Sequence, residues 1–439
     1  MKRDISDELK KWKDSRRRKP LLVTGVRQCG KTYIIKQFGD EYFTNCVTVN
    51  FEGQSRYSEI FDYDFDVSRI IKELQTVTKE KIVPGKTLLF FDEIQECPRA
   101  ITALKYFCEN MKELHVICAG SLLGVALKQE NISFPVGKVN RIRLYPMSFK
   151  EFVTACGEED MIDILRDWNT DRAIPELYSV PMQKMLKDYY IVGGMPEAVQ
   201  TWIDTNDYDE VDAVMKEILN DYADDFSKHS PIVELPKIRW IWDSVPVQLA
   251  KDNNKFIFSH VKKGKRAADL ENAMQWLKDA GLIYQLELVE KPETPLSAFA
   301  DTSYFKVYMS DVGLLRVRSN VSYSTILDEN ENYIRYKGAF AENYVNNELI
   351  ALGKNPYFWR SGNTAEIDFM YDGAESFIPV EVKAADNTQA KSYRQFCKRY
   401  TPKKGFKLSL KNIGENMCED TQTFNLPLYM TWNIERYEK

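Results

Sequence analysis

The segment Gly25-Val-Arg-Gln-Cys-Gly-Lys-Thr32 constrains the fold of this chain more than any other part of its sequence. It matches the pattern GxxxxGK[ST], follows a β-rich run (21–25) and opens a helical segment (32–39), which predicts a phosphate-binding loop between a strand and a helix. Glycines let backbone N–H groups surround phosphates, Lys31 neutralises β and γ oxygens, and the Thr32 hydroxyl binds Mg²⁺. The expected nucleotide-binding residues are Gly25, Val26, Arg27, Gln28, Cys29, Gly30, Lys31 and Thr32.

A second motif is the apolar run 88–91, which ends in Asp92 and Glu93. A buried parallel strand ends where ligands bind, at the carboxyl edge of its sheet. We expect Asp92 to hold the Mg²⁺ shell and Glu93 to orient and activate the attacking water. The simpler alternative is a strand that ends in a charged turn. Because a strand and a helix separate the loop from Asp92, the sheet resembles that of additional-strand ATPases rather than that of nucleotide kinases.

Three further polar residues are candidates for the same catalytic site. Ser121 follows an apolar run (115–120) and is expected to act as a sensor of the γ-phosphate, although serine at a strand end is also a common turn residue. Arg141 and Arg143 lie on the last predicted strand of the core. One of them is a candidate arginine finger toward a neighbouring subunit, and the alternative is that both cover a solvated face.

The length, charge and composition restrict the remaining possibilities. A chain of 439 residues predicts two to four domains, and a formal charge of −5 means that any polyanion must bind a local basic surface. Eight cysteines without a CxxC pair favour reduced thiols and therefore a cytoplasmic protein. Three scattered histidines argue against a zinc site. The longest apolar run, 116–127, is shorter than the ~20 residues of a membrane span, so no membrane partner is expected.

Several segments together carry a family resemblance. The phosphate loop, the run FFDEIQ (90–95), the run LYPMSFKEF (144–152) and Gly193-Gly-Met-Pro196 resemble the prokaryotic AAA-type ATPases whose C-terminal half is a domain of unknown function. The resemblance spans nearly the whole chain. It implies ATP and Mg²⁺ as cofactors, hydrolysis in the N-terminal half, phosphate binding by the loop, and metal and water handling by Asp92 and Glu93.

One departure from the family pattern concerns the arginine finger. Gly137-Lys138 precedes the last core strand where Gly-Arg is expected. Lysine cannot reproduce a bidentate guanidinium contact. The departure weakens the assignment of a finger in this region.

Residues 231–325 resemble a winged helix, with helices near 237–250 and 266–280 followed by a two-stranded wing. The stretch 255–266 (KFIFSHVKKGKR) has five Lys and Arg residues and no acidic residue, directly before the candidate recognition helix. Such a patch can bind DNA phosphates. Winged helices also serve as protein-docking modules, and basic runs are often solvated loops.

The last segment contains a pattern that is typical of nucleases. Glu342 lies on a predicted helix, Asp368 on one predicted strand, and Glu381 and Lys383 on the next. This order resembles the PD-(D/E)xK superfamily, in which two carboxylates bind Mg²⁺ and the lysine activates water at a phosphodiester. A basic helix follows the pattern. The alternative is a domain that has kept this fold as a binding module.

The predicted fold class is α/β with four parts: an AAA-type P-loop core (1–150), a helical lid (151–230), a winged helix (231–325) and a restriction-endonuclease-like domain (326–439). The expected function is an ATPase that couples its nucleotide state to a DNA-binding, nuclease-like half. The expected partners are ATP or ADP and DNA, and assembly into a homo-oligomer is compatible with this scheme. The alternatives are a nucleotide-gated protein-docking scaffold and an ATP-regulated, Mg²⁺-dependent DNA nuclease.

Overall fold

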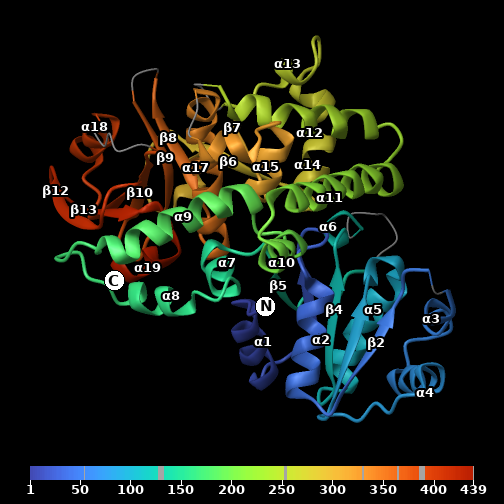
Figure 1. Ribbon diagram of the computed structural model, residues 1–439. Helices are drawn as coiled ribbons and strands as arrows, with labels where there is room; N and C mark the ends of the chain where they lie inside the picture. The colour runs from blue at the N-terminus through green and yellow to red at the C-terminus, as the bar shows by residue number, and fades with distance from the viewer. Residues whose placement is uncertain are drawn as a thin grey trace. The chain divides into compact units, whose positions relative to one another are not determined.

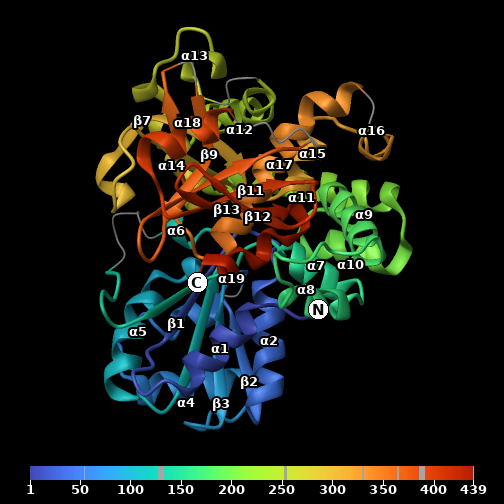
Figure 2. The ribbon, with the colours of Figure 1, turned by 90° about the vertical axis from the view of Figure 1, so that its left-hand side faces the viewer.

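The computed structural model (Figures 1 and 2) divides into two compact units. Unit 1 contains residues 1–145 and 279–282, and unit 2 contains residues 146–278 and 283–439. The structure describes residues 1–53, 55–126, 133–251, 255–328, 331–362, 365–384 and 391–438. The protein is therefore mixed α/β, with an N-terminal unit that matches the predicted P-loop core.

Unit 1 is built on a five-stranded parallel sheet in the order β2-β3-β4-β1-β5. The predicted strands are confirmed, with small differences at their ends. β4 lies between β1 and β3, which confirms the additional-strand arrangement. The strands are β1 (Leu21–Thr24), β2 (Asn45–Asn50), β3 (Thr87–Asp92), β4 (His115–Gly120) and β5 (Asn140–Arg143).

Helices cover both faces of this sheet (Figures 1 and 2). On one face α2 buries Ile34, Ile35 and Phe38. On the other face α4 and α5 share a continuous core with β1 to β4, and this core forms because the strands are apolar on both sides. The helices are α1 (Ile5–Asp14), α2 (Lys31–Tyr42), α3 (Ser55–Glu59), α4 (Val67–Thr78), α5 (Pro98–Asn110) and α6 (Leu123–Ala126), with a 3₁₀ turn, η1 (Ile94–Glu96).

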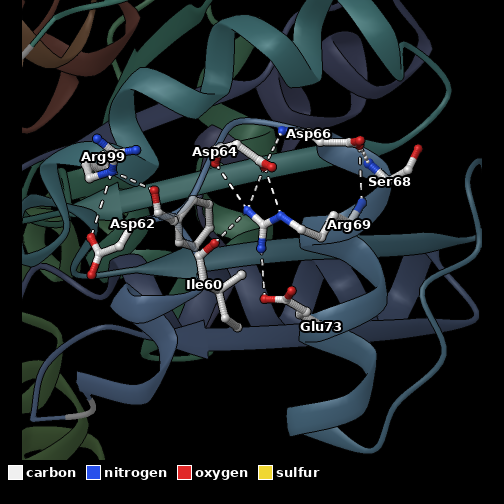
Figure 3. A network of polar contacts seen from close by, with 9 residues as sticks. Ile60, Asp62, Asp64, Asp66, Ser68, Arg69, Glu73 and Arg99 are labelled. Carbon is white, nitrogen blue, oxygen red and sulfur yellow. Dashed lines mark hydrogen bonds and ion pairs between the residues drawn. The ribbon is translucent and has the colours of Figure 1, made fainter.

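A polar network fixes the start of α4 (Figure 3). Asp66 caps the helix by accepting from the N–H groups of Ser68 and Arg69, at 2.8 and 3.3 Å. The Arg69 guanidinium donates to Asp64 (2.9 Å) and lies 2.9 Å from Glu73. The cap satisfies N–H groups that have no partner within the helix. Asp66 is therefore the N-cap, and the helix that the sequence predicts over 66–78 begins one residue later, at Val67.

His115 makes the stability of unit 1 depend on pH. Its ring is 8% exposed and packs edge-on against Trp12 and Phe43. Burial, helped by the charge of Arg18, lowers the pKa of His115 from 6.5 to about 4. The histidine therefore stays neutral in the folded state while the unfolded chain becomes protonated. The free energy of unfolding that neutral His115 contributes is fully present above pH 6.5. It decreases by about 3 kcal/mol as the pH falls to about 4.

We expect hydrogen-exchange protection of the β4 amides to weaken between pH 6.5 and pH 4.5, and to weaken less in His115→Gln. The exposed His260 provides the matched control, because His260→Gln should keep the wild-type pH dependence. If the protection of the β4 amides depends on pH equally in wild type and in His115→Gln, groups other than His115 cause the loss of protection.

Unit 2 begins at residue 146 and its first part is helical. In the described ranges no helix has both the length and the apolarity that a membrane span requires. The helices are α7 (Phe149–Ala155), α8 (Glu159–Arg166), α9 (Glu176–Val192), α10 (Pro196–Thr205), α11 (Tyr208–His229), α12 (Leu235–Leu249), α13 (Phe258–Val261), α14 (Ala267–Asp279), α15 (Val312–Arg318), α16 (Tyr323–Leu327), α17 (Glu331–Ala351), α18 (Lys391–Tyr400) and α19 (Ile434–Glu438).

Unit 2 also contains an eight-stranded mixed sheet in the order β12-β13-β11-β10-β9-β8-β6-β7. The predicted hairpin is present as β6 and β7, and a single bridge, Leu288 to Phe358, joins it to β8. The sheet thus continues across the boundary expected near 325. The strands are β6 (Ile283–Val289), β7 (Ala300–Met309), β8 (Tyr357–Ser361), β9 (Ala365–Asp372), β10 (Phe377–Val382), β11 (Lys404–Ser409), β12 (Gly414–Cys418) and β13 (Thr421–Pro427).

Two of the motifs that carried the family resemblance meet in the core of unit 2. The Met147 N–H donates to the carbonyl of Gly194 (2.6 Å), and the Gly194 N–H donates to Asp311 (2.6 Å). Gly193 has φ 71°, and a Cβ there would lie 2.3 Å from an Asp311 oxygen. Only glycine combines this conformation with such a close approach. The motifs are therefore explained by packing rather than by chemistry.

Candidate functional site

The phosphate loop runs from β1 to α2, as the sequence predicts. Gly25 has φ 157°, and a Cβ at this position would lie 2.2 Å from the carbonyl oxygen of Leu144. Gly30 is the left-handed residue that precedes the first turn of α2. The loop therefore approaches neighbouring backbone too closely for a side chain, and its end directs the free N–H groups of a helix start toward a ligand.

Lys31 and Thr32 occupy the first turn of α2. The Lys31 side chain is 6% exposed, and its ammonium donates to the carbonyls of Gly25 and Val26 at 3.0 and 2.9 Å. The Thr32 hydroxyl donates to Asp92 Oδ2 at 2.9 Å. Two segments 60 residues apart are thus brought together, and a positive charge lies against the loop that the sequence predicts to hold phosphates.

The acidic pair lies at the carboxyl end of β3. Asp92 is 5% exposed, and burial raises its pKa despite the hydrogen bond from Thr32. Glu93 follows in a left-handed conformation, with φ 48° and ψ 47°. A residue other than glycine rarely adopts this conformation, and such strain is common at functional sites. The hydroxyl of Thr32 and the carboxylate of Asp92 are hard oxygen donors of the kind that Mg²⁺ prefers.

Gln95 is a neighbour of Glu93 that the sequence analysis missed. Its Nε2 donates to Glu93 Oε2 at 2.6 Å, while its Oε1 is buried without a hydrogen-bond partner among the described residues. This oxygen lies 2.2 Å from where a Cβ on Gly120 would be. Gln95 therefore fills the space between the carboxylate of Glu93 and the end of β4. The residue belongs to the run FFDEIQ, which was the only hint in the sequence.

In unit 2 the structure brings together the four residues of the predicted nuclease-like site. Glu342 lies on α17, Asp368 on β9 and Glu381 on β10, and Lys383 directly follows β10. Lys383 Nζ is 2.6 Å from Glu381 Oε1. Asp368 Oδ2 accepts a hydrogen bond from the Val382 N–H at 2.7 Å. We call this group, with the three residues described next, the acidic cluster.

Three members of the acidic cluster were not predicted. Lys306 and Tyr308 lie on β7 and Glu366 on β9. The Lys306 ammonium is 2.6 Å from Glu366 Oε1 and 3.5 Å from Glu342 Oε2, and the Tyr308 hydroxyl donates to Glu342 Oε2 at 2.8 Å. The alternation of Lys306 and Tyr308 was visible, but on a hairpin it is typical of a solvated face.

The charges of the acidic cluster depend on one another. Burial raises the pKa of Asp368 well above its ordinary value, and Glu381 and Glu342 add to this effect. Burial likewise raises the pKa of Glu381, against the influence of Lys383. For Lys306, burial alone would lower the pKa, but the neighbouring carboxylates raise it above its ordinary value. The neighbouring carboxylates therefore keep Lys306 protonated. In return, the charge of Lys306 stabilises the ionised form of those carboxylates, which burial disfavours.

Comparison with known families identifies unit 1. The family model described as "AAA domain" matches residues 17–153, which contain the phosphate loop and the acidic pair. The chain carries an AAA-type P-loop ATPase domain. Two further models, each described as a domain of unknown function (DUF8612 and DUF4143), match residues 183–325 and 337–429. The combination of an AAA domain with C-terminal domains of unknown function is thus confirmed.

Solved structures resemble the chain only distantly, and a search of curated proteins finds no match. The Walker-type ATPase PABY2304 of Pyrococcus abyssi is 15% identical, with 72% of this chain and 95% of that chain covered and a TM-score of 0.45. The Aeropyrum pernix ORC1 protein in complex with DNA is 12% identical, with 74% and 95% covered and a TM-score of 0.31. AMPPCP-bound DnaA from Aquifex aeolicus is 11% identical, with 63% and 87% covered and a TM-score of 0.27.

Other predicted residues of the AAA domain lie on β5 or directly after β4. Ser121 follows β4 and is 6% exposed, next to the glycine that Gln95 contacts. Arg141 and Arg143 are both exposed on β5. Arg143 pairs in register with Thr24, directly before the phosphate loop, whereas Arg141 pairs with Leu22 and lies over the Phe134 ring. Arg143 is therefore the nearer of the two to the loop.

Arg3 is another residue of the AAA domain that the sequence did not reveal. Its side chain is 6% exposed, and it donates to the carbonyl of Cys29 (3.1 Å) and to that of Tyr145 (2.7 Å). It therefore supports the phosphate loop from behind. No local pattern marks it, because its partners are distant in sequence.

Proposed function

We propose that the AAA domain binds ATP with Mg²⁺ and hydrolyses it. The observation that carries the proposal is the hydrogen bond between Thr32 and Asp92, 2.9 Å long, beside the buried ammonium of Lys31. A hydroxyl and a carboxylate at this distance can share one Mg²⁺ shell, and the cation would neutralise the γ-phosphate charge. Lys31 would exchange its two carbonyl partners for phosphate oxygens, because charge-assisted hydrogen bonds are stronger than neutral ones.

Hydrolysis requires a group that positions water in line with the γ-phosphate. Glu93 is the proposed base, since it follows Asp92 and its carboxylate is oriented by Gln95. The unpartnered oxygen of Gln95 offers an acceptor for the same water. Ser121 is proposed as a γ-phosphate sensor, and Arg143 or Arg141 as a finger toward a second copy in a homo-oligomer.

The test of this proposal is calorimetry of the purified protein with Mg²⁺ and a non-hydrolysable ATP analogue, followed by measurement of phosphate release from ATP. We expect binding of one nucleotide and a turnover that requires Mg²⁺. If neither heat nor phosphate release is detected, the proposal is wrong.

For unit 2 we propose DNA binding coupled to the nucleotide state, with residues 151–230 as a lid, 231–325 as a winged helix and 326–439 as a nuclease-like domain. The supporting observation is the basic stretch 255–266, in which Lys262, Lys263 and Arg266 are exposed. In the described part of the chain these three side chains form no ion pair. Lys262 also lies over the Trp240 ring, 5.1 Å from its centroid. Exposed basic side chains without carboxylate partners are suited to phosphates. The eight free thiols support a cytoplasmic location.

DNA affinity measured at two salt concentrations tests this second proposal. With about four phosphate contacts, affinity should fall about 100-fold between 50 and 200 mM salt. The charge reversal of Lys262 and Lys263 to glutamate should remove most of the binding, and Lys216→Glu on α11, also exposed, is the matched control. A protein-docking scaffold would bind DNA at neither salt concentration.

A further inference from the structure

The PD-(D/E)xK-like order of the acidic cluster implies a Mg²⁺ ion between its carboxylates. The residues present do not fit one. In the described ranges no group of three or more Asp, Glu, His or Cys side chains is arranged to hold a metal ion. The cations that the carboxylates of the cluster contact are the ammonium of Lys306, at 2.6 Å from Glu366 and 3.5 Å from Glu342, and the ammonium of Lys383, at 2.6 Å from Glu381.

Lys306 is unusual because it is deeply buried among acids. Its side chain is 2% exposed, and a lysine at such a depth is retained only when its charge is paired. A divalent ion bound to Glu342 and Asp368 would lie a few ångströms from this ammonium. Two positive charges at that separation repel each other strongly where water is excluded. The ammonium and a metal ion therefore compete for the carboxylate of Glu342.

Each carboxylate that a metal would need already has a partner. Lys383 lies 2.6 Å from Glu381, and Glu342 is bound by both Lys306 and Tyr308. Asp368 accepts from a backbone N–H. Glu381 Oε2 is buried without a hydrogen-bond partner among the described residues, but Mg²⁺ needs several oxygen ligands in a near-octahedral arrangement.

We propose that the Lys306 ammonium occupies the cation position of the acidic cluster, so that unit 2 binds its partner without metal-dependent cleavage. In this role Lys306 links β7 to β9 and to α17, across a region where the hairpin joins the rest of the sheet by one bridge. The nuclease alternative is thereby disfavoured, and the proposal does not depend on ATP hydrolysis.

The experiment is a titration of the full chain with Mn²⁺ in the absence of nucleotide, in which electron paramagnetic resonance measures the free and the bound Mn²⁺. All proteins carry Asp92→Asn, so that the AAA domain contributes no metal. We expect no saturable Mn²⁺ binding while Lys306 is present. Lys306→Met should gain one Mn²⁺ with at least about tenfold higher affinity, and adding Asp368→Asn should remove it. Lys354 is the matched control, since it is also a largely buried lysine between two glutamates, and Lys354→Met should gain no site that depends on Asp368.

Two results would overturn the proposal. One is Mn²⁺ binding that Asp368→Asn abolishes in protein that retains Lys306. The other is a folded Lys306→Met protein that binds no more Mn²⁺ than its parent. If Lys306→Met does not fold, proteins that retain Lys306 are compared with and without Asp368→Asn. Saturable Mn²⁺ binding that depends on Asp368 contradicts the proposal, and the absence of such binding supports it.

Discussion

Replacing Lys31 with alanine should weaken nucleotide binding by the AAA domain about 100-fold or more. The Lys31 ammonium is buried and donates to two carbonyls of the phosphate loop, so it is already positioned where phosphate oxygens are expected. Loss of one member of a buried, hydrogen-bonded charge pair costs about 3 kcal/mol or more, which corresponds to about 100-fold in dissociation constant. Calorimetry with Mg²⁺ and a non-hydrolysable ATP analogue measures this loss directly.

The matched control is Lys72→Ala, which removes an exposed lysine from α4 of the same unit and should leave the affinity unchanged. Lys31→Arg keeps the charge but has a planar, longer head group, so it should not restore binding. Thermal unfolding of each variant separates a lost phosphate contact from a collapsed loop. Wild-type affinity in a folded Lys31→Ala protein would remove the phosphate loop from the proposed function.

The core of unit 1 was predictable because short, continuous segments of the sequence specify its strands and its motifs. Each strand is a short apolar run, and the phosphate loop and the acidic pair lie at the strand ends where parallel sheets bind ligands. The position of β4 between β1 and β3 followed from the order of the motifs along the chain. The hydrogen bond between Thr32 and Asp92 then required no further information, since both residues lie at the same edge of the sheet.

The sheet of unit 2 was only partly predictable. β9, β10 and the hairpin were expected, whereas β8 and β11 to β13 were missed. Pairing between strands that are distant along the chain leaves little trace in the sequence of either strand. Alternation of apolar and polar residues also fits a solvated strand as well as a strand that packs on a helix. For the same reason Lys306 on β7 gave no sign that Glu366 and Glu342 would surround it.

The residues that support the proposed catalytic residues could not be predicted from the sequence. Gln95 contacts Glu93 and Arg3 contacts the loop at Cys29, but neither belongs to the pattern GxxxxGK[ST] or to the acidic pair. Motifs name the residues that touch phosphate and metal. The residues that orient them depend on the tertiary fold, and only the structure reveals those contacts.

Replacing Glu93 with glutamine should leave nucleotide binding intact and stop hydrolysis. Glutamine has nearly the shape of glutamate and can keep a hydrogen bond to Gln95, but it cannot accept a proton from water. General-base catalysis contributes about 10²–10⁴-fold, so single-turnover phosphate release should slow by that factor while the dissociation constant for ATP changes little. The protein should then retain unhydrolysed ATP through gel filtration.

Two neighbours of Glu93 make this prediction specific. Glu96→Gln removes an exposed carboxylate three residues away and should hydrolyse ATP at the wild-type rate. Gln95→Ala keeps the base but removes the group that orients it, so it should lower turnover less than Glu93→Gln does and leave the affinity for ATP unchanged. If Glu93→Gln hydrolyses ATP as fast as wild type while Lys31→Ala does not bind it, nucleotide is bound at the loop but another residue activates the water.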